Sequence, residues 1–207
     1  MSKLDQKAHW DRIYQTRSET DFSWFQSYPE TSLRFIKLFD LLPNSRIIDV
    51  GGGDSHLVDA LLDIGFRNIY VLDISEKAIE RARKRLGNDA TLVNWIIKDV
   101  LDFHPLMKFD LWHDRAAFHF LTTYQKIRDY LAIAKKSIKQ NGFLTLGTFS
   151  EKGPTRCSGL EIKRYSELFM SKLFEQRFDR IKCIEENHLT PFKTIQSFTF
   201  CSFKRSQ

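Results

Sequence analysis

Arg46-Ile-Ile-Asp-Val-Gly-Gly-Gly-Asp-Ser-His56 is the stretch that decides the fold of this chain. Its first five residues read as a short buried strand, and three glycines follow at once. Apolar residues then recur at helical spacing: Leu57, Val58, Leu61 and Leu62. Strand, glycine turn and helix in this order are the layout of a nucleotide-binding α/β unit. The glycines allow unusual backbone angles and a close approach of the backbone to a ligand.

A second signal lies further along the chain. The apolar run Ile69–Leu72 ends in Asp73, and an acid about twenty residues past the glycines can bind two ribose hydroxyls. The dinucleotide-binding fingerprint requires one more glycine, but His56 occupies that place, and no Gly-Lys-Ser/Thr follows. Both observations argue against a pyrophosphate or a nucleoside triphosphate at this helix start.

The composition is that of a soluble globular protein. The 207 residues suit one domain, 1–207, and 42% of them are hydrophobic and 28% charged. The net charge of +6 is spread along the chain, and its densest run, 81–85, falls on a predicted helix. A solvated helix face explains that run better than a nucleic-acid patch. No run approaches the roughly twenty apolar residues of a membrane span. We therefore expect neither a nucleic-acid partner nor a membrane partner.

The cysteines give information about the compartment. The chain has three cysteines, an odd number, and they are widely spaced: Cys157, Cys183 and Cys201. No Cys-x-x-Cys occurs. This pattern predicts neither a disulfide framework nor a zinc site. The N-terminus also lacks an apolar signal core. We expect a reduced, cytoplasmic compartment.

Strands and helices are expected to alternate. Strands are predicted at 46–50, 68–72, 91–98, 109–113, 143–149, 180–186 and 197–203, and helices at 29–42, 55–64, 75–86, 123–139 and 165–174. The alternation predicts an α/β fold, doubly wound around a mostly parallel sheet with helices on both faces. Ligands of such sheets bind beyond the carboxyl ends of the strands. The first four strands end there in Gly51–Gly53, Asp73, Asp99 and His113-Asp114-Arg115.

The glycine stretch, read as Asp49-x-Gly51-x-Gly53-x-Ser55, resembles motif I of class I S-adenosylmethionine (SAM)-dependent methyltransferases. The resemblance covers residues 46–150 and, more loosely, the whole chain. It implies a seven-stranded sheet with an antiparallel seventh strand, with SAM as cofactor and S-adenosylhomocysteine as product. The residues that it assigns to the cofactor are Asp49, Gly51, Gly52, Gly53, Ser55, Asp73, Ile74, Asp99, Val100 and Asp114.

The resemblance also implies a role for each acid. Asp49 would lie near the amino group of SAM, Asp73 would bind the ribose, and Asp99 would accept from the adenine amine. Ile74 and Val100 would flank the flat base. These roles fit the side chains, since carboxylates accept hydrogen bonds from hydroxyls and amines.

An N-terminal arm, residues 1–30, is rich in aromatic side chains. Trp10 and Tyr14 stand one helical turn apart in Trp-Asp-x-x-Tyr. Similar openings cover the SAM site of several small methyltransferases, so we expect the arm to form a lid over the cofactor. Packing of the same rings onto the core is the alternative.

The residues after the fourth strand are candidates for chemistry. We expect Asp114 to orient the acceptor, and His119 or His113 to take a proton if the acceptor carries one. Arg115 either holds an acidic acceptor or pairs with Asp114. The spacing of the histidines and Asp114 matches no standard metal motif, so no metal is expected. The residues expected to line the acceptor pocket are Trp24, Tyr28, Arg115, Phe118 and Cys157.

The acceptor itself has several candidates. The segment His113–Phe118 lacks the Asn/Asp-Pro-Pro-Tyr/Phe of enzymes that methylate nucleic-acid bases. The chain resembles both small-molecule methyltransferases of the thiopurine type and small protein-lysine methyltransferases. A small molecule is the first hypothesis, a protein lysine is the second, and a SAM-binding protein without catalysis is the third. We expect a monomer or a weak dimer.

Overall fold

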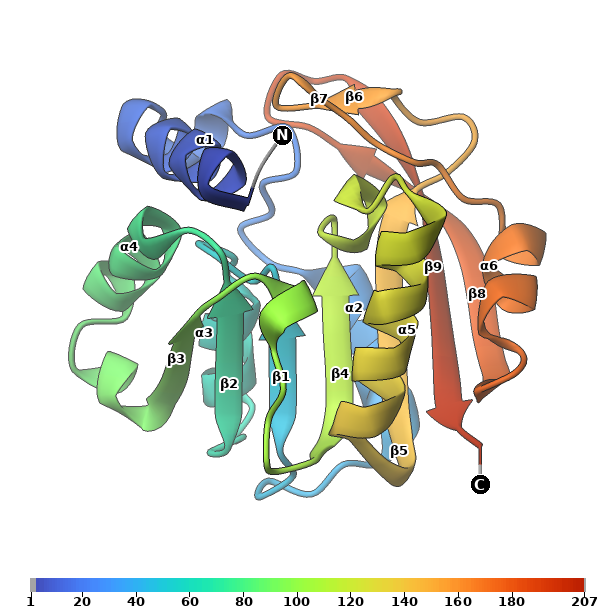
Figure 1. Cartoon of the computed structure of the whole chain (residues 1–207). Helices are drawn as coiled ribbons and strands as arrows, with labels where there is room; N and C mark the ends of the chain where they lie inside the picture. Colours follow the sequence, from blue (N-terminus) through green and yellow to red (C-terminus); the bar gives the residue numbers. More distant parts are fainter. Residues whose placement is uncertain (1–2, 207) are drawn as a thin grey trace.

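The structure is a computed structural model that describes residues 3–206. Met1, Ser2 and Gln207, at the ends of the expected domain and arm, lie outside the described residues. A seven-stranded sheet runs through the molecule in the order β3-β2-β1-β4-β5-β9-β8 (Figure 1). The strands are β1 (Ile47–Val50), β2 (Ile69–Asp73), β3 (Val93–Ile97), β4 (Phe109–Arg115), β5 (Ile138–Phe149), β8 (Phe178–Leu189) and β9 (Ile195–Arg205).

The pairing of the strands confirms the predicted fold class. β1 pairs in parallel with β2 and β4, β2 with β3, and β4 with β5. β9 lies between β5 and β8 and is antiparallel to both. This is the antiparallel seventh strand that the methyltransferase resemblance implies.

Helices cover both faces of the sheet (Figure 1). On one face, α2 (Glu30–Ile36), α3 (Leu57–Asp63) and α4 (Glu76–Leu86) enclose an aliphatic core with the inner side chains of β1 and β2. On the other face, α5 (Tyr124–Ser137) and α6 (Glu167–Phe174) enclose a core that is richer in aromatic rings. The central strands are therefore buried on both sides, as continuous apolar runs in a parallel sheet require.

Several boundaries differ from the sequence prediction. The helix expected to reach residue 139 ends at Ser137, and β5 begins at once at Ile138. Asn141 then takes a left-handed backbone (φ 62°) within the irregular start of β5. The segment after β5 contains a small hairpin of β6 (Arg156–Cys157) and β7 (Leu160–Glu161). An Asn-Gly pair signals a turn but does not place the end of the preceding helix.

The arm is an ordered part of the fold. It consists of α1 (Lys3–Thr16), a short 3-10 turn at Glu19–Asp21 and an aromatic segment. The Asp11 carboxylate accepts hydrogen bonds from the Ser75 hydroxyl (2.8 Å) and the Lys77 amide (3.2 Å) at the start of α4. Arg81 of α4 donates to the carbonyl of Tyr14 (3.0 Å). These bonds hold α1 against α4, above the carboxyl ends of the strands (Figure 1).

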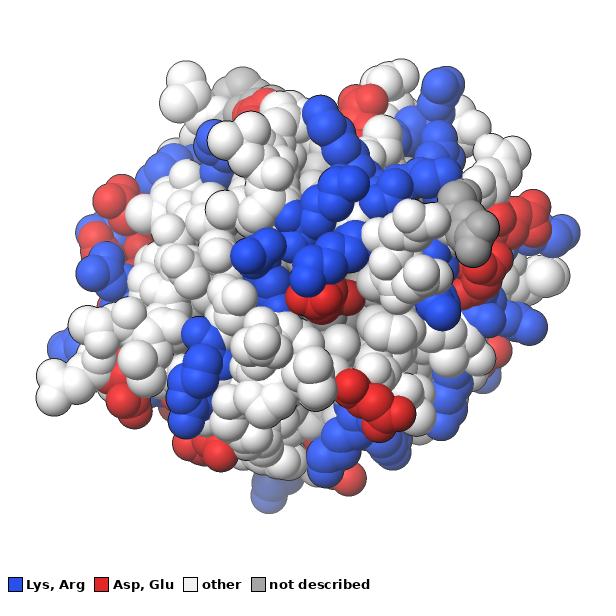
Figure 2. Space-filling model, turned by 90° about the horizontal axis from the view of Figure 1, so that it is seen from below, with Lys and Arg blue, Asp and Glu red and all other residues white. Residues whose placement is uncertain are grey.

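Positive charge gathers on the opposite end of the molecule. Figure 2 shows Lys and Arg side chains grouped in the middle of the face at the amino ends of the parallel strands. Lys139 pairs there with Asp110 (2.8 Å), and Arg46 donates to the carbonyl of Lys108 (2.9 Å). The net charge of +6 therefore says little about the ligand site, which lies at the other end of the strands.

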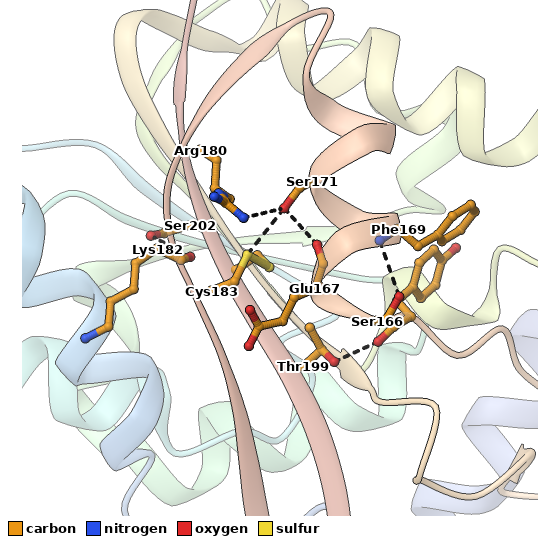
Figure 3. Close-up of a disulfide and its surroundings, with 11 residues drawn as sticks. Ser166, Glu167, Phe169, Ser171, Arg180, Lys182, Cys183, Thr199 and Ser202 are labelled. Carbon is orange, nitrogen blue, oxygen red and sulfur yellow. Dashed lines mark hydrogen bonds between the residues drawn. A yellow bond between two sulfur atoms is a disulfide. The ribbon is translucent and has the colours of Figure 1, made fainter.

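A disulfide joins Cys183 of β8 to Cys201 of β9, two residues that face each other across the pair (Figure 3). The Ser171 hydroxyl of α6 lies 3.8 Å from the Cys183 sulfur and accepts a hydrogen bond from Arg180 (3.4 Å). The prediction of a chain without disulfides is therefore wrong. Cysteine spacing could not reveal the pair, because the register of two strands in the sheet brings them together.

No helix within residues 3–206 is both long and apolar enough to cross a membrane.

The disulfide is expected to stabilise the terminal strands. The two cysteines are 18 residues apart, and a cross-link over a loop of this size contributes roughly 2–3 kcal/mol to the free energy of unfolding. Reduction, or the double change Cys183→Ser with Cys201→Ser, should lower the midpoint of urea unfolding accordingly. Cys157→Ser, which removes the buried free thiol and keeps the disulfide, is the control and should lose stability on reduction as the wild type does, whereas the double variant should not respond to reductant. Three free thiols in the unreduced, unfolded protein would contradict the pairing.

Candidate functional site

A deep cavity opens at the carboxyl ends of β1, β2 and β4, under the N-terminal arm. Most of the residues that the sequence assigned to the cofactor line it: Trp10, Tyr14, Asp49, Gly51, Gly52, Ser55, Asp73, Ile74, Asp99 and Val100. Four residues assigned to the acceptor or to catalysis also line it: Trp24, His113, Arg115 and Cys157. The strand ends thus meet in one site, as parallel strands dictate.

The glycine turn is packed so tightly that no side chain fits. Gly51 has a φ of +66°, and a Cβ there would lie 2.3 Å from the Cβ of Ala117. Gly53 has a φ of +45°, and a Cβ there would lie 2.9 Å from a carboxylate oxygen of Asp73. A Cβ on Gly52 would lie 2.6 Å from Oδ2 of Asp49. The glycines therefore bring the backbone of the turn against two carboxylates.

Asp49 is held by a buried chain of hydrogen bonds. Its Oδ1 lies 2.7 Å from Nδ1 of His113, and Nε2 of the same ring lies 2.9 Å from the Ser32 hydroxyl. All three residues are buried. Both ring nitrogens of His113 are thus engaged, so this histidine fixes the Asp49 carboxylate and has no free nitrogen to take a proton from an acceptor. The proton-accepting role expected for His113 does not fit this geometry.

Asp73 is a buried carboxyl at the end of β2. Its Oδ1 accepts a hydrogen bond from the Ser75 amide (2.7 Å), and Oδ2 lies by Gly53. Burial, together with the charges of Asp49 and Asp11, raises the pKa of Asp73 to about 7, against the effect of the Ser75 bond. A pKa this high means that too few hydrogen-bond donors surround the carboxyl to stabilise its ionised form. Donors on a ligand would therefore stabilise its ionised form.

The residues that follow β3 form another part of the cavity wall. The Asp99 side chain accepts a hydrogen bond from the Leu101 amide (2.9 Å), which begins a 3-10 turn at Val100–Asp102. Ile74, which follows β2, and Val100, which follows β3, also line the cavity. One carboxylate beside two apolar side chains is a suitable surface for a flat base with an amine.

The charge of the lining favours a cationic ligand. The carboxylates outnumber the fixed cations in the lining: Glu19, Asp49, Asp54, Asp73 and Asp99 against Lys98, Arg115 and Lys126. At the start of α3, Nε2 of His56 lies 3.2 Å from the Glu19 carboxylate. That pair occupies the place where a dinucleotide's pyrophosphate would sit, so the structure agrees with the exclusion of NAD drawn from His56.

The arm forms an aromatic roof over the cavity. Trp10 packs edge-on against Trp24 (6.1 Å between centroids) and against Phe120 (5.1 Å). Phe22 stacks on Trp24 (4.8 Å) and lies edge-on to Tyr14 (5.1 Å). Tyr14 and Phe22 are also buried in a small core with α4. The same rings thus pack against the core and line the cavity, and their role as a lid over the cofactor stays a prediction.

Asp114 lies behind the cavity wall, contrary to the expectation for a residue that touches cofactor and acceptor. Its Oδ1 accepts from the amides of Ala117 (3.2 Å) and Phe118 (3.0 Å), and its Oδ2 accepts from the Tyr130 hydroxyl (2.8 Å). The side chain is fully buried. Burial raises its pKa to about 6 against those three bonds. Asp114 therefore fixes the turn after β4 from the core side.

Three more expected site residues lie elsewhere. His119 is fully buried, stacked on Phe149 at 4.9 Å, and neither ring nitrogen has a partner among the described residues. Burial and the charge of Arg115 lower its pKa to about 3, so it stays neutral and takes no proton at physiological pH. Phe118 is buried in the core with Tyr130. Tyr28 is exposed and lines a neighbouring groove rather than this cavity.

Cys157 does line the cavity, as expected. It is buried, and burial raises its pKa to about 12. A neutral thiol is a poor nucleophile, so Cys157 contributes to the lining and not to the chemistry. Sequence reasoning missed other lining residues, among them several in the arm and in the segment after β4: Gln6, Glu19, Phe25, Ala116, Ala117 and Phe120.

Asp114 is expected to act on stability rather than on ligand binding. Asp114→Asn leaves one acceptor oxygen for three donors, which should cost about 1–3 kcal/mol of unfolding free energy. Because the folded pKa of about 6 lies above the ordinary 3.8, ionisation destabilises the wild type as the pH rises through this range. The gap in thermal midpoint between wild type and variant should thus narrow from pH 5 to pH 8. A variant of normal stability that binds no SAM would instead place Asp114 in the site.

Known proteins share this arrangement. A family model described as "Methyltransferase domain" matches residues 48–144. The eEF1A lysine and N-terminal methyltransferase of Bos taurus is 31% identical over 119 residues, which are 56% of this chain and 16% of that protein. Malonyl-[acyl-carrier protein] O-methyltransferase 1 of Ilyobacter polytropus is 26% identical over 165 residues, 74% of this chain and 60% of that protein. The chain thus spans only part of the length of these relatives.

Among solved structures, a Burkholderia thailandensis 1,6-didemethyltoxoflavin-N1-methyltransferase with its substrate and S-adenosylhomocysteine bound superposes with a TM-score of 0.68. The identity is 15%, over 99% of this chain and 85% of that one. Likeness at this level concerns the fold, and it agrees with the strand order seen here. Residues 48–144 thus match a methyltransferase domain, the sheet has the strand order of the class I methyltransferase fold, and both findings imply S-adenosylmethionine as the cofactor.

Proposed function

We propose that this protein transfers the methyl group of SAM to a small-molecule acceptor. The observation that carries the proposal is the cavity itself, whose lining combines the carboxylates Asp49, Asp73 and Asp99 with Arg115 at the end of β4. The arm encloses the site with aromatic side chains, and an enclosed site suits a small acceptor better than a segment of a folded protein.

The residues present fit SAM. Asp49 keeps one oxygen toward the cavity, since the other is bonded to His113, and would hold the ammonium group. Asp73 would accept hydrogen bonds from the two ribose hydroxyls, which would relieve its lack of donors. Asp99 would accept from the adenine amine between Ile74 and Val100. Trp10 and Tyr14 would close over the cofactor.

The chemistry needs little from the protein beyond position. When bound, SAM supplies an activated methyl group, which passes to a lone pair of the acceptor as the carbon–sulfur bond breaks and its electron pair stays on sulfur. This chain's own residues bind and orient the partners and keep water out. Since His113 is engaged and His119 and Asp114 lie outside the cavity, none of them is placed to take a proton. An acceptor atom that arrives without a proton to lose fits this site best.

A protein lysine is the second candidate, because the Bos taurus relative is named a lysine methyltransferase. A lysine must lose a proton before it can attack, and its ammonium group would meet the charge of Arg115 on the acceptor side. Both points favour the small molecule. A cytoplasmic location and a monomeric or weakly dimeric state remain predictions from the sequence.

The cofactor assignment predicts a pH-dependent affinity. Asp73→Asn should weaken SAM binding about 10- to 100-fold, because a charge-assisted bond to a diol contributes roughly 1.5–3 kcal/mol. With a pKa of about 7 in the free protein, Asp73 must lose its proton to bind the diol well. Wild-type affinity should therefore fall as the pH drops from 8 to 6, with proton release on binding, whereas the variant should show a nearly flat profile. Titration calorimetry in buffers of different ionisation enthalpy measures both effects.

Asp63→Asn, on the exposed end of α3, is the matched control and should behave like the wild type. Equal affinity of the Asp73 variant for SAM, or binding of NAD in place of SAM, would remove the cofactor assignment.

The acceptor class can be tested directly. Labelled SAM is incubated with the protein and cell lysate, and the products are separated into protein and small-molecule fractions. We expect the label in the small-molecule fraction. Label on protein lysines would establish the second candidate. SAM binding without turnover on any fraction would indicate a SAM-binding protein without catalysis.

A further inference from the structure

Arg115 lines both the cofactor cavity and a neighbouring groove, together with Phe25 and Gln26, and it is the charged member of the three. The groove runs between the arm and the hairpin of β8 and β9, and its lining includes Tyr28, Thr31, Asn187, His188, Phe198 and Phe200. A ligand that lies in the groove can therefore reach the cavity past the Arg115 side chain.

Arg115 forms no ion pair among residues 3–206, although the charge of Asp49, which is bonded to His113, acts on it from a greater distance. Its Nη1 donates to the carbonyl of Trp24 (2.9 Å), while its Nε is shut off from solvent and has no hydrogen-bond partner. No carboxylate of the described chain lies within ion-pair distance of the guanidinium, and Asp114 is fully bonded on the far side of β4. Guanidinium groups in enclosed sites are ordinarily paired, so this one lacks the partner that its surroundings call for.

The orientation of the group is also fixed. The guanidinium carbon lies 4.9 Å from the centre of the Phe198 ring, and stacking on a ring leaves the N–H groups at the edge free for an anion in the guanidinium plane. Burial lowers the pKa of Arg115 to about 10, which leaves it charged at neutral pH. Glu186, at the rim of the groove, is paired with Arg34 at 2.6 Å and does not neutralise Arg115.

We infer that Arg115 anchors a carboxylate group of the methyl acceptor, in a subsite at the junction of the groove and the cavity. This inference rests on the proposed function and narrows its substrate class to small carboxylic acids. A carboxylate matches the fork of the guanidinium and supplies the missing counter-ion. The acceptor is thereby oriented by its acid group, without any need for Asp114 or a histidine.

The test compares acids with their neutral isosteres. The full chain is saturated with S-adenosylhomocysteine and titrated with benzoate, phenylacetate and hexanoate, and with the three corresponding amides. In the wild type, at least one acid should bind about 10-fold or more tightly than its amide. In Arg115→Gln the preference should vanish, and in Arg115→Lys it should be partial, because lysine keeps the charge but loses the fork. Arg128→Gln, an exposed arginine on α5, is the control that should keep the full preference.

Binding of S-adenosylhomocysteine separates this inference from the proposed function. If the wild type and Arg115→Gln both bind it but acids and amides bind alike, or no acid binds at millimolar concentration, the carboxylate subsite is wrong and the methyltransferase proposal stands. If the wild type binds no S-adenosylhomocysteine, the proposed function fails. Should the variants not fold, modification of wild-type Arg115 by phenylglyoxal, followed by peptide mass spectrometry, gives the answer. Benzoate, and not benzamide, should protect Arg115, and equal modification in both would overturn the inference.

Discussion

The site depends on how closely the glycine turn approaches its neighbours. A Cβ on Gly51 would clash with Ala117 after β4, one on Gly52 with Asp49 of β1, and one on Gly53 with Asp73 at the end of β2. Each such Cβ would lie closer to its neighbour than real Cβ atoms come. Because the turn has no side chains, three strand ends converge around a single backbone segment. The acids that would bind the cofactor are positioned by that convergence, and a side chain on any of the three glycines would push them apart.

The parts of the fold and the site that local patterns encode could be predicted. The apolar runs predicted the strands. Asp49, Asp73 and Asp99 line one cavity, as expected, because each lies at or near the carboxyl end of a parallel strand. The error at β4 has a physical cause. Successive side chains of a strand point to opposite faces, so His113 and Arg115 face the cavity side while Asp114 between them faces Tyr130. The sequence prediction assumed that Asp114 would face the site because its two neighbours in sequence do.

Other features depend on contacts that are distant in sequence. The pairing of Cys183 with Cys201 follows from the register of β8 and β9, and the isolation of His119 follows from the ring of Phe149 on β5. The N-terminal arm could be predicted only in part. Its Trp-Asp-x-x-Tyr opening predicted aromatic cover, but the attachment of Asp11 to the start of α4 is a tertiary contact that no local pattern contains.

The distribution of charge in the cavity suits methyl transfer to an acid-bearing molecule. The carboxylates of the lining would favour the sulfonium and ammonium groups of SAM, and Arg115 in the same lining would favour an anion. Methyl transfer from a sulfonium removes the positive charge from sulfur, so the electrostatic attraction that holds the cofactor weakens once the reaction is complete. In an enclosed site of low polarity such charge differences have large effects. The residues proposed to bind the substrates would therefore also favour release of the product, without a catalytic base.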